Sequence, residues 1–194
     1  MSLVRPLLLC ASLSLAVPAL AADVGQPAPA FTLRDEVGTS HALEQYRGKI
    51  VVLEWTNPEC PFVQRHYAAR TMQKTLASFA GKKVVWLAVD STSHNTPASS
   101  KSWKAQQGFG YPVLQDASGD VGHAYGAKTT PHMFVIDEKG VLRYAGGIDD
   151  DPRGRSTAPT NFVERAVSAL LAGQPVSPST SDPYGCSVKY GKSS

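Results

Sequence analysis

Cys60 is the residue whose type and position most favour chemistry in this chain. It follows the apolar run Ile50 to Trp55 and directly precedes Pro61. The run predicts a buried strand, and proline suits the first turn of a helix, where its missing N–H costs nothing. A thiol between the two faces the positive end of a helix dipole and free amide donors, which favour the thiolate. We therefore expect nucleophilic sulfur chemistry, the alternative being an inert thiol that fills the helix start.

Cys60 has no cysteine partner nearby. The place three residues later, where a Cys-x-x-Cys pair has its second sulfur, is Val63. Cys186 lies 126 residues further on (186 − 60), but the entropy cost of closing a loop grows only logarithmically with its length. Cys186 could thus resolve an oxidised Cys60 by forming a disulfide. A structural clamp and an intermolecular link are the alternatives.

Residues 1–21 have the pattern of an export signal. Arg5 supplies a positive charge, residues 6–17 form an apolar run, and Ala19-Leu20-Ala21 supplies a small-residue cleavage site. Cleavage would remove Cys10 and leave Cys60 and Cys186 as the two cysteines of the mature protein. We predict an exported protein, located in the bacterial periplasm. We expect no stable membrane insertion, because no later segment is apolar over the width of a bilayer.

Charge and cysteine content limit the class of partner. The formal net charge is +3, without long basic runs, which argues against nucleic acid. Soft metals such as Cu(I) prefer paired sulfur ligands, and the segment around Cys60 contains no second cysteine. We therefore predict neither a metal centre nor a cofactor.

The spacing of apolar residues predicts strands that alternate with helices, an α/β fold with a central sheet flanked by helices. One domain would span residues 22–174, followed by an irregular tail over 175–194 that carries Cys186. The expected strands cover residues 31–33, 50–55, 84–89, 133–136 and 141–145, and the expected helices cover 61–80, 96–107, 121–125 and 161–172.

Several stretches carry a family resemblance in the same order along the chain. They are Pro27 to Leu33, Tyr46-Arg47-Gly48-Lys49, the strand into Cys60, Thr129 to Asp137, Gly140 to Tyr144, and Gly185-Cys186-Ser187-Val188-Lys189. Together they resemble the thioredoxin-fold redoxins, which include AhpC/TSA-like, peroxiredoxin-like and exported thioredoxin-like proteins. The resemblance covers most of the chain after residue 21 and implies a thioredoxin-like fold with a mixed β-sheet.

The resemblance also implies roles for particular residues. Cys60 matches the nucleophilic cysteine, and Pro61 follows it at the helix start. Thr130-Pro131 resembles the cis-proline loop that lies against the sulfur and offers backbone groups to a substrate peptide, an ordinary trans proline being the alternative. Glu54 matches a buried acid that relays protons to thiols, unless it is exposed at the strand end.

Further polar residues could surround the sulfur. His66 and His132 could stabilise a thiolate, or could be surface or supporting residues. Asn57 stands where relatives often have a second cysteine, and where peroxiredoxins have Thr or Ser, while Thr56 is one place further back. Pro131 stands about where peroxiredoxins have an arginine. For that arginine, Arg65 or Arg143 would have to substitute.

Three classes of function follow. The first is an exported thiol–disulfide oxidoreductase that acts on a protein thiol or disulfide and depends on a reducing thiol partner. The second is a thiol peroxidase that reduces hydroperoxides. The third is a metal- or haem-handling chaperone, which ranks last because it needs more local ligands. A catalytically idle binding domain is a further alternative.

Overall fold

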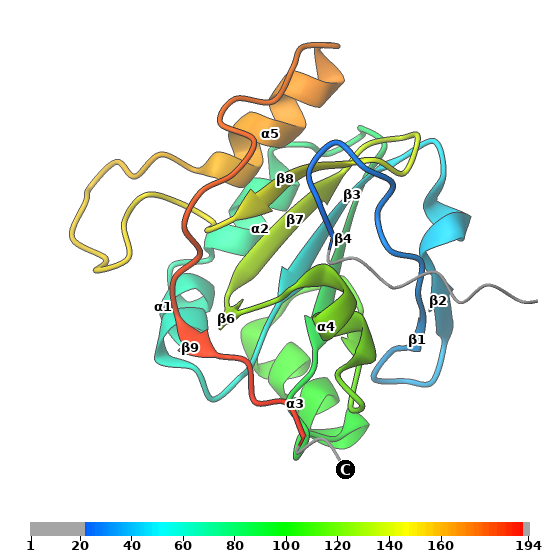
Figure 1. Cartoon of the computed structure of the whole chain (residues 1–194). Coiled ribbons are helices and arrows are strands. Elements are labelled where there is room, and N and C mark those ends of the chain that lie inside the picture. The colour runs from blue at the N-terminus through cyan, green and yellow to red at the C-terminus, as the bar shows by residue number, and fades with distance from the viewer. Residues whose placement is uncertain (1–21, 192–194) are drawn as a thin grey trace, which may run out of the picture.

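A seven-stranded sheet forms the centre of the computed structural model, which describes residues 22–191 (Figure 1). The strand order is β2-β1-β5-β4-β3-β7-β8, with β3, β4 and β5 parallel and β7 antiparallel to β3. The strands of this sheet are β1 Thr32–Arg34, β2 Ser40–Ala42, β3 Ile50–Trp55, β4 Val84–Asp90, β5 Val113–Gln115, β7 His132–Ile136 and β8 Leu142–Gly146. The fold is α/β and thioredoxin-like, with a mixed sheet flanked by helices, as the sequence predicts.

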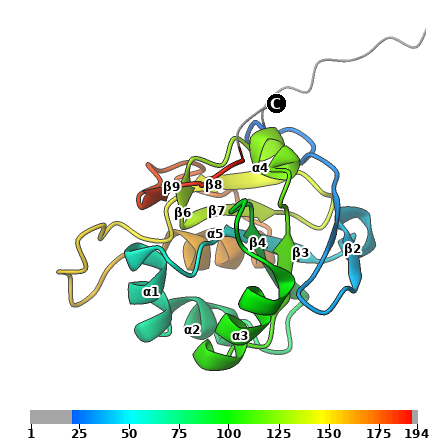
Figure 2. The ribbon, with the colours of Figure 1, turned by 90° about the horizontal axis from the view of Figure 1, so that it is seen from below.

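Helices cover both faces of the sheet (Figure 2). On one face lie α1 Pro61–Ala68, α2 Thr71–Ala77, α3 Pro97–Gln107 and α5 Phe162–Leu171. The other face is covered by α4 Asp120–Tyr125, the 3-10 helix η1 Leu43–Tyr46 and the N-terminal segment. Strand β3 is buried at every residue, because it lies inside the sheet with side chains packed on both sides.

The helix expected over residues 61–80 is wrong as a single element. Arg70 has a left-handed backbone (φ 57°), and it separates α1 from α2. Ala69, directly after α1, is exposed, whereas Met72 of α2 is fully buried. The break changes the direction of the chain so that the buried residues of both helices reach the same core, which a straight helix would not allow.

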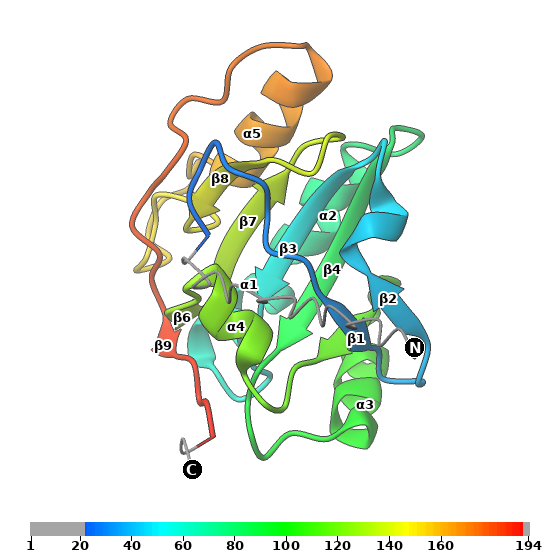
Figure 3. The same ribbon diagram turned by 45° about the vertical axis from the view of Figure 1, so that its right-hand side comes forward.

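The C-terminal segment returns along the edge of the sheet after α5. It has no regular structure until β9 Cys186–Ser187, which pairs with the short strand β6 Thr129–Thr130. We call residues 179–190 the strap. Figure 3 shows the strap descending beside β8 and passing β6. The sequence predicted an irregular tail here but neither β6 nor β9.

Within residues 22–191, no helix has the length and apolar content needed to cross a bilayer. The predicted signal at residues 1–21 lies outside the described residues.

Candidate active site

Cys60 occupies the position that the sequence predicts, between the end of β3 and the start of α1. It is the N-cap residue of α1, and Pro61 is the first residue of the helix. A tight turn precedes it, in which the Cys60 amide donates to the carbonyl oxygen of Asn57 at 3.0 Å. The side chain of Cys60 is only 1% exposed. Access to its sulfur therefore depends on what covers it.

Cys186 is the residue that covers Cys60. The two sulfurs lie 2.8 Å apart, and both cysteines are free thiols in this structure. The pairing of β9 with β6 holds them there, because Cys186 is directly opposite Thr130 in the register. The structure thus brings together two cysteines that are 126 residues apart in the chain.

Thr130 and Pro131 form the wall of the site. The peptide bond between them is cis, so the expectation taken from the resemblance is confirmed and the trans alternative is wrong. The carbonyl oxygen of Thr130 lies 2.9 Å from the Cys60 sulfur and accepts a hydrogen bond from it when the thiol is protonated. Pro131 directly precedes β7, so the wall is an extension of the central sheet.

The two thiols have different acidities. Burial acts to raise the pKa of Cys60, but contacts with the Cys186 thiol, the Thr130 side chain and the Val63 amide outweigh it and lower that pKa. Burial and the neighbouring Cys60 sulfur raise the pKa of Cys186 to about 11. Cys60 is therefore the thiol that ionises first, and in that state it can accept a hydrogen bond from Cys186.

Glu54 is fully buried, as the resemblance implies, so the alternative of exposure at the strand end is wrong. The indole N–H of Trp86 and the hydroxyl of Tyr67 donate to its Oε2 at 2.8 and 3.1 Å. Tyr67 is also hydrogen-bonded to Tyr111 at 2.8 Å. Burial raises the pKa of Glu54 to about 7 in spite of these donors. Glu54 can thus gain or lose a proton near neutral pH, and it contacts α1, the helix that begins after Cys60, through Tyr67.

Neither histidine supplies a positive charge to the sulfur in this structure. His132 is buried, its Nδ1 accepts from the Lys128 amide at 3.2 Å, and burial lowers its pKa to about 4. His66 is also buried, and burial lowers its pKa. Its Nε2 lies 3.0 Å from the hydroxyl of Tyr184, which in turn donates to Asp149. His66 therefore contacts the strap, and His132 supports the loop before β7.

The side chains that the sequence offers for peroxidase chemistry form their hydrogen bonds away from the Cys60 sulfur. The side chain of Asn57 accepts from the Glu59 amide at 2.9 Å and so belongs to the turn, and Thr56 is buried at the end of β3. Arg65 bonds the carbonyl oxygens of Asp151 and Pro152. Arg143 pairs with Asp137 at 2.7 Å, beyond the far end of β7.

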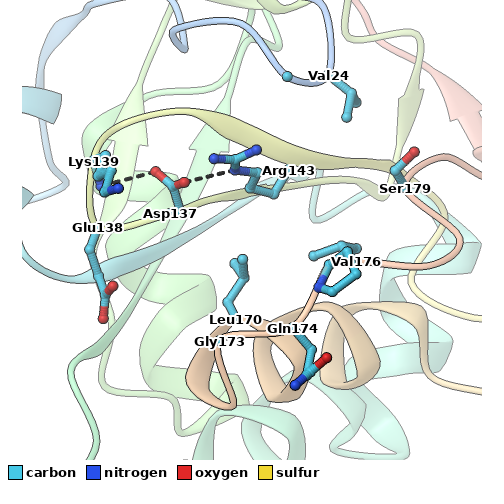
Figure 4. A pocket seen from close by; sticks show the side chains of 12 residues that line it. Val24, Asp137, Glu138, Lys139, Arg143, Leu170, Gly173, Gln174, Val176 and Ser179 are labelled. Atoms are coloured by element: carbon cyan, nitrogen blue, oxygen red, sulfur yellow. Dashed lines mark hydrogen bonds and ion pairs between the residues drawn. The ribbon is translucent and has the colours of Figure 1, made fainter.

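A hollow of about 470 Å³ lies at that far end, between the β7–β8 turn and the end of α5 (Figure 4). Asp137 and Arg143 line it together with Leu170 and Val176. Because β7 is antiparallel to β3, with Trp55 opposite His132 and Val51 opposite Ile136, this hollow and Cys60 are at opposite ends of the sheet. It is therefore not part of the thiol site.

Sequence reasoning missed the aromatic residues of the strap. Tyr184 packs against the ring of Phe62, with centroids 6.1 Å apart, and Tyr190 stacks on His123 at 4.0 Å. A tyrosine two residues before Cys186 and another four after it were the available signal. Within residues 22–191, no three His, Cys, Asp or Glu side chains gather as a metal site would require.

Comparisons with known proteins agree with this geometry. The model of the AhpC/TSA family matches residues 24–145. Alkyl hydroperoxide reductase E of Mycobacterium tuberculosis is 31% identical over 131 residues, covering 63% of this chain and 84% of the relative. Thiol-disulfide oxidoreductase ResA of Geobacillus thermodenitrificans is 28% identical over 123 residues, covering 63% and 68%.

A solved structure extends the likeness to nine-tenths of the chain. The crystal structure of a hypothetical protein from Sinorhizobium meliloti 1021 superposes with a TM-score of 0.81 at 28% identity, covering 90% of this chain and 98% of that one. The chain belongs to the AhpC/TSA family of thioredoxin-fold redoxins. It is accordingly a thiol-dependent oxidoreductase.

Proposed function

We propose that the protein is an exported thiol–disulfide oxidoreductase that cycles between a Cys60/Cys186 dithiol and a Cys60–Cys186 disulfide. The observation that supports this most directly is the 2.8 Å separation of the two sulfurs. At this distance, a disulfide needs little further movement of β9 or of the start of α1. The pair thus replaces the Cys-x-x-Cys dithiol that the sequence around Cys60 does not contain.

The proposed cycle uses the difference in acidity between the two thiols. The Cys60 thiolate attacks one sulfur of a substrate disulfide RS–SR, which forms a Cys60–S–S–R bond and releases RS⁻, and RS⁻ then takes up a proton. Cys186 loses its proton and attacks the Cys60 sulfur, which releases the second RS⁻. The two protein thiols are oxidised and RS–SR is reduced to two RSH. Two equivalents of an external thiol R′SH then reduce the protein disulfide to two thiols and are themselves oxidised to R′S–SR′.

Other residues have supporting roles in this proposal. Glu54, whose pKa burial raises to about 7, exchanges protons with the buried site. Pro61 begins the helix whose N-terminus favours the thiolate. Thr130 and Pro131 hold the backbone against which the sulfur reacts. Asn57 and Thr56 shape the preceding turn, and His66 and His132 support the strap and the Thr130–Pro131 loop.

The alternative substrate is a hydroperoxide, which the likeness to an alkyl hydroperoxide reductase favours. A peroxide would convert Cys60 to a sulfenic acid, and Cys186 would then form the same disulfide with release of water. The positions of Arg65 and Arg143 argue against this, because each is engaged with other oxygens. We infer export from the pattern of residues 1–21.

Substitution of each cysteine tests the proposal. Cys60→Ser should abolish disulfide exchange, whereas Cys186→Ser should still attack a disulfide but stop at the mixed disulfide, visible by intact mass. Ser187→Ala, the next residue of β9, serves as the control and should keep the wild-type rate. Loss of all exchange in wild type, together with fast second-order oxidation of Cys60 by hydrogen peroxide, would replace the proposal with the peroxidase.

A further inference from the structure

The strap is fastened to the fold on both sides of Cys186. On the side before Cys186, the amide of Ser181 donates to the Ala145 carbonyl, and the Ser181 hydroxyl accepts from the Gly147 amide at 3.0 Å. Tyr184 then packs over α1, where it bonds His66 and Asp149. This part of the strap is therefore tied both to β8 and to the helix that begins at Cys60.

The fastening after Cys186 uses different elements. Val188 donates its amide to the Lys128 carbonyl at 3.2 Å, and Lys189 accepts from the Ser93 amide at 3.0 Å. Tyr190 stacks on His123 of α4, and its hydroxyl donates to the Ala127 carbonyl at 2.8 Å. Tyr190 is thus the last side chain that holds the strap down within the described residues.

Between the two fastenings, the strap lies against the backbone with no spare room. Gly185 has φ 143°, and a side chain on it would overlap the carbonyl oxygen of Thr130. Thr129 and Thr130 are paired with Ser187 and Cys186. The backbone groups that a second extended chain would need at this edge are therefore already used by the protein itself.

An extended peptide and a small disulfide differ in what they require here. A peptide that adds a strand to a sheet edge gains affinity from main-chain hydrogen bonds, and so it competes directly with β9. A small disulfide needs only a path to the sulfur of Cys60, which the Cys186 side chain covers. The first requires the strap to leave, whereas the second requires only a local shift.

We propose that the strap acts as an internal substrate-like strand, which makes the site selective for low-molecular-weight disulfides over extended polypeptides, and that Tyr190 is a specificity-determining residue. This inference depends on the proposed function, because it concerns which RS–SR reaches Cys60. In the docked state, a small disulfide is reduced to two thiols while Cys60 and Cys186 are oxidised. A polypeptide disulfide undergoes the same exchange only after β9 separates from β6.

The test compares two substrates with the same reacting bond. The first is bis(2-hydroxyethyl) disulfide, and the second is an unstructured ten-residue peptide whose single cysteine carries the 2-mercaptoethanol mixed disulfide. We expect wild type to react at least about tenfold faster with the small disulfide. Tyr190→Ala should raise the rate with the peptide about tenfold and change the rate with the small disulfide by less than about twofold, and Tyr190→Phe, which keeps the stacked ring, should fall between.

Tyr46→Ala is the matched control, because Tyr46 of η1 is also stacked on a histidine, His41 of β2. It should leave the ratio of the two rates at the wild-type value. Equal rates for both substrates in wild type, or a peptide rate unchanged in both Tyr190 variants, would overturn the inference while leaving the proposed function intact. Absence of exchange with either substrate in wild type would instead refute the proposed function.

His123→Ala is a second variant that tests the same contact if Tyr190→Ala does not fold. It removes the other half of the stacked pair and leaves the strap sequence unchanged. His123→Ala and Tyr190→Ala should both raise the rate with the peptide. If neither raises it, the strap does not determine the specificity.

Discussion

The two ends of the central sheet hold their polar groups through different kinds of contact. Where β3 ends, the Cys60 sulfur meets Thr130 and Cys186, which are 70 and 126 residues away in the chain. Where β3 begins, Asp137 is satisfied by the amides of Lys139 and Val141 and by Arg143, all within six residues. The reactive end thus depends on distant segments, and the other end on a local turn.

The largest expected difference between the two ends is in the pH dependence of stability. Burial raises the pKa of Glu54 from 4.5 to about 7. Because its pKa is higher in the folded state, its contribution to the free energy of unfolding is present below pH 4.5 and is lost as the pH rises to about 7, by about 3 kcal/mol. Glu54→Gln should remove this decline, as measured by urea unfolding from pH 2 to 8.

Asp137→Asn provides the contrast at the other end. Partial burial acts to raise the pKa of Asp137, but hydrogen bonds from Val141 and Arg143 outweigh it and lower that pKa below 3.8. The stabilisation from Asp137 is therefore present above that pH and is lost in acid, the opposite direction to Glu54. His132 is unchanged in both variants, so its own titration cancels in the difference. Parallel pH profiles for wild type and Glu54→Gln would contradict the assignment of Glu54.

A pair of glycine substitutions, one at each end of the sheet, should show a smaller difference between the two ends. Gly185→Ala would place a methyl group against the Thr130 backbone, whereas Gly140→Ala, also at positive φ, would meet only the movable guanidinium of Arg47. Both should cost about 1 kcal/mol from the left-handed backbone. Only Gly185→Ala should displace the strap, so that reduced Cys60 reacts about tenfold faster with the ten-residue peptide mixed disulfide described above. Equal rates with this peptide in the two variants would show that the strap does not keep extended chains from the sulfur.

Arg143→Ala should have the smallest effect. Its ion pair with Asp137 is partly exposed, so its loss should cost less than about 1 kcal/mol. The rate at which hydrogen peroxide oxidises Cys60 should stay within about twofold of wild type, measured by loss of the free thiol. A tenfold fall would connect Arg143 to the sulfur and contradict the separation of the two ends.

The same contrast explains what the sequence could predict. The β7–β8 hairpin and strand β3 have short apolar patterns and local turn residues, and both were predicted within one or two positions. The place of Cys60 followed from its neighbours, because an apolar strand and Pro61 flank it directly. The thioredoxin-like fold followed from the order of these elements and the family motifs.

The remaining features depend on contacts that no local pattern encodes. Strands β6 and β9 have two residues each and are too short for any periodicity. The break at Arg70 has no proline or glycine to mark it, since it serves the packing of α1 and α2 on one core. The burial of Glu54 became visible only when Trp86 and Tyr67 were placed beside it.

The long separation between Cys60 and Cys186 has a consequence for unfolding. A bond between these sulfurs would enclose most of the domain in one covalent ring. A ring of this size lowers the conformational entropy of the unfolded chain, which raises the free energy of unfolding by about 5 kcal/mol. The reduced protein has no such restriction. Each turnover would therefore change how firmly the entire domain resists denaturation, so that thermal melting could report the redox state of the protein.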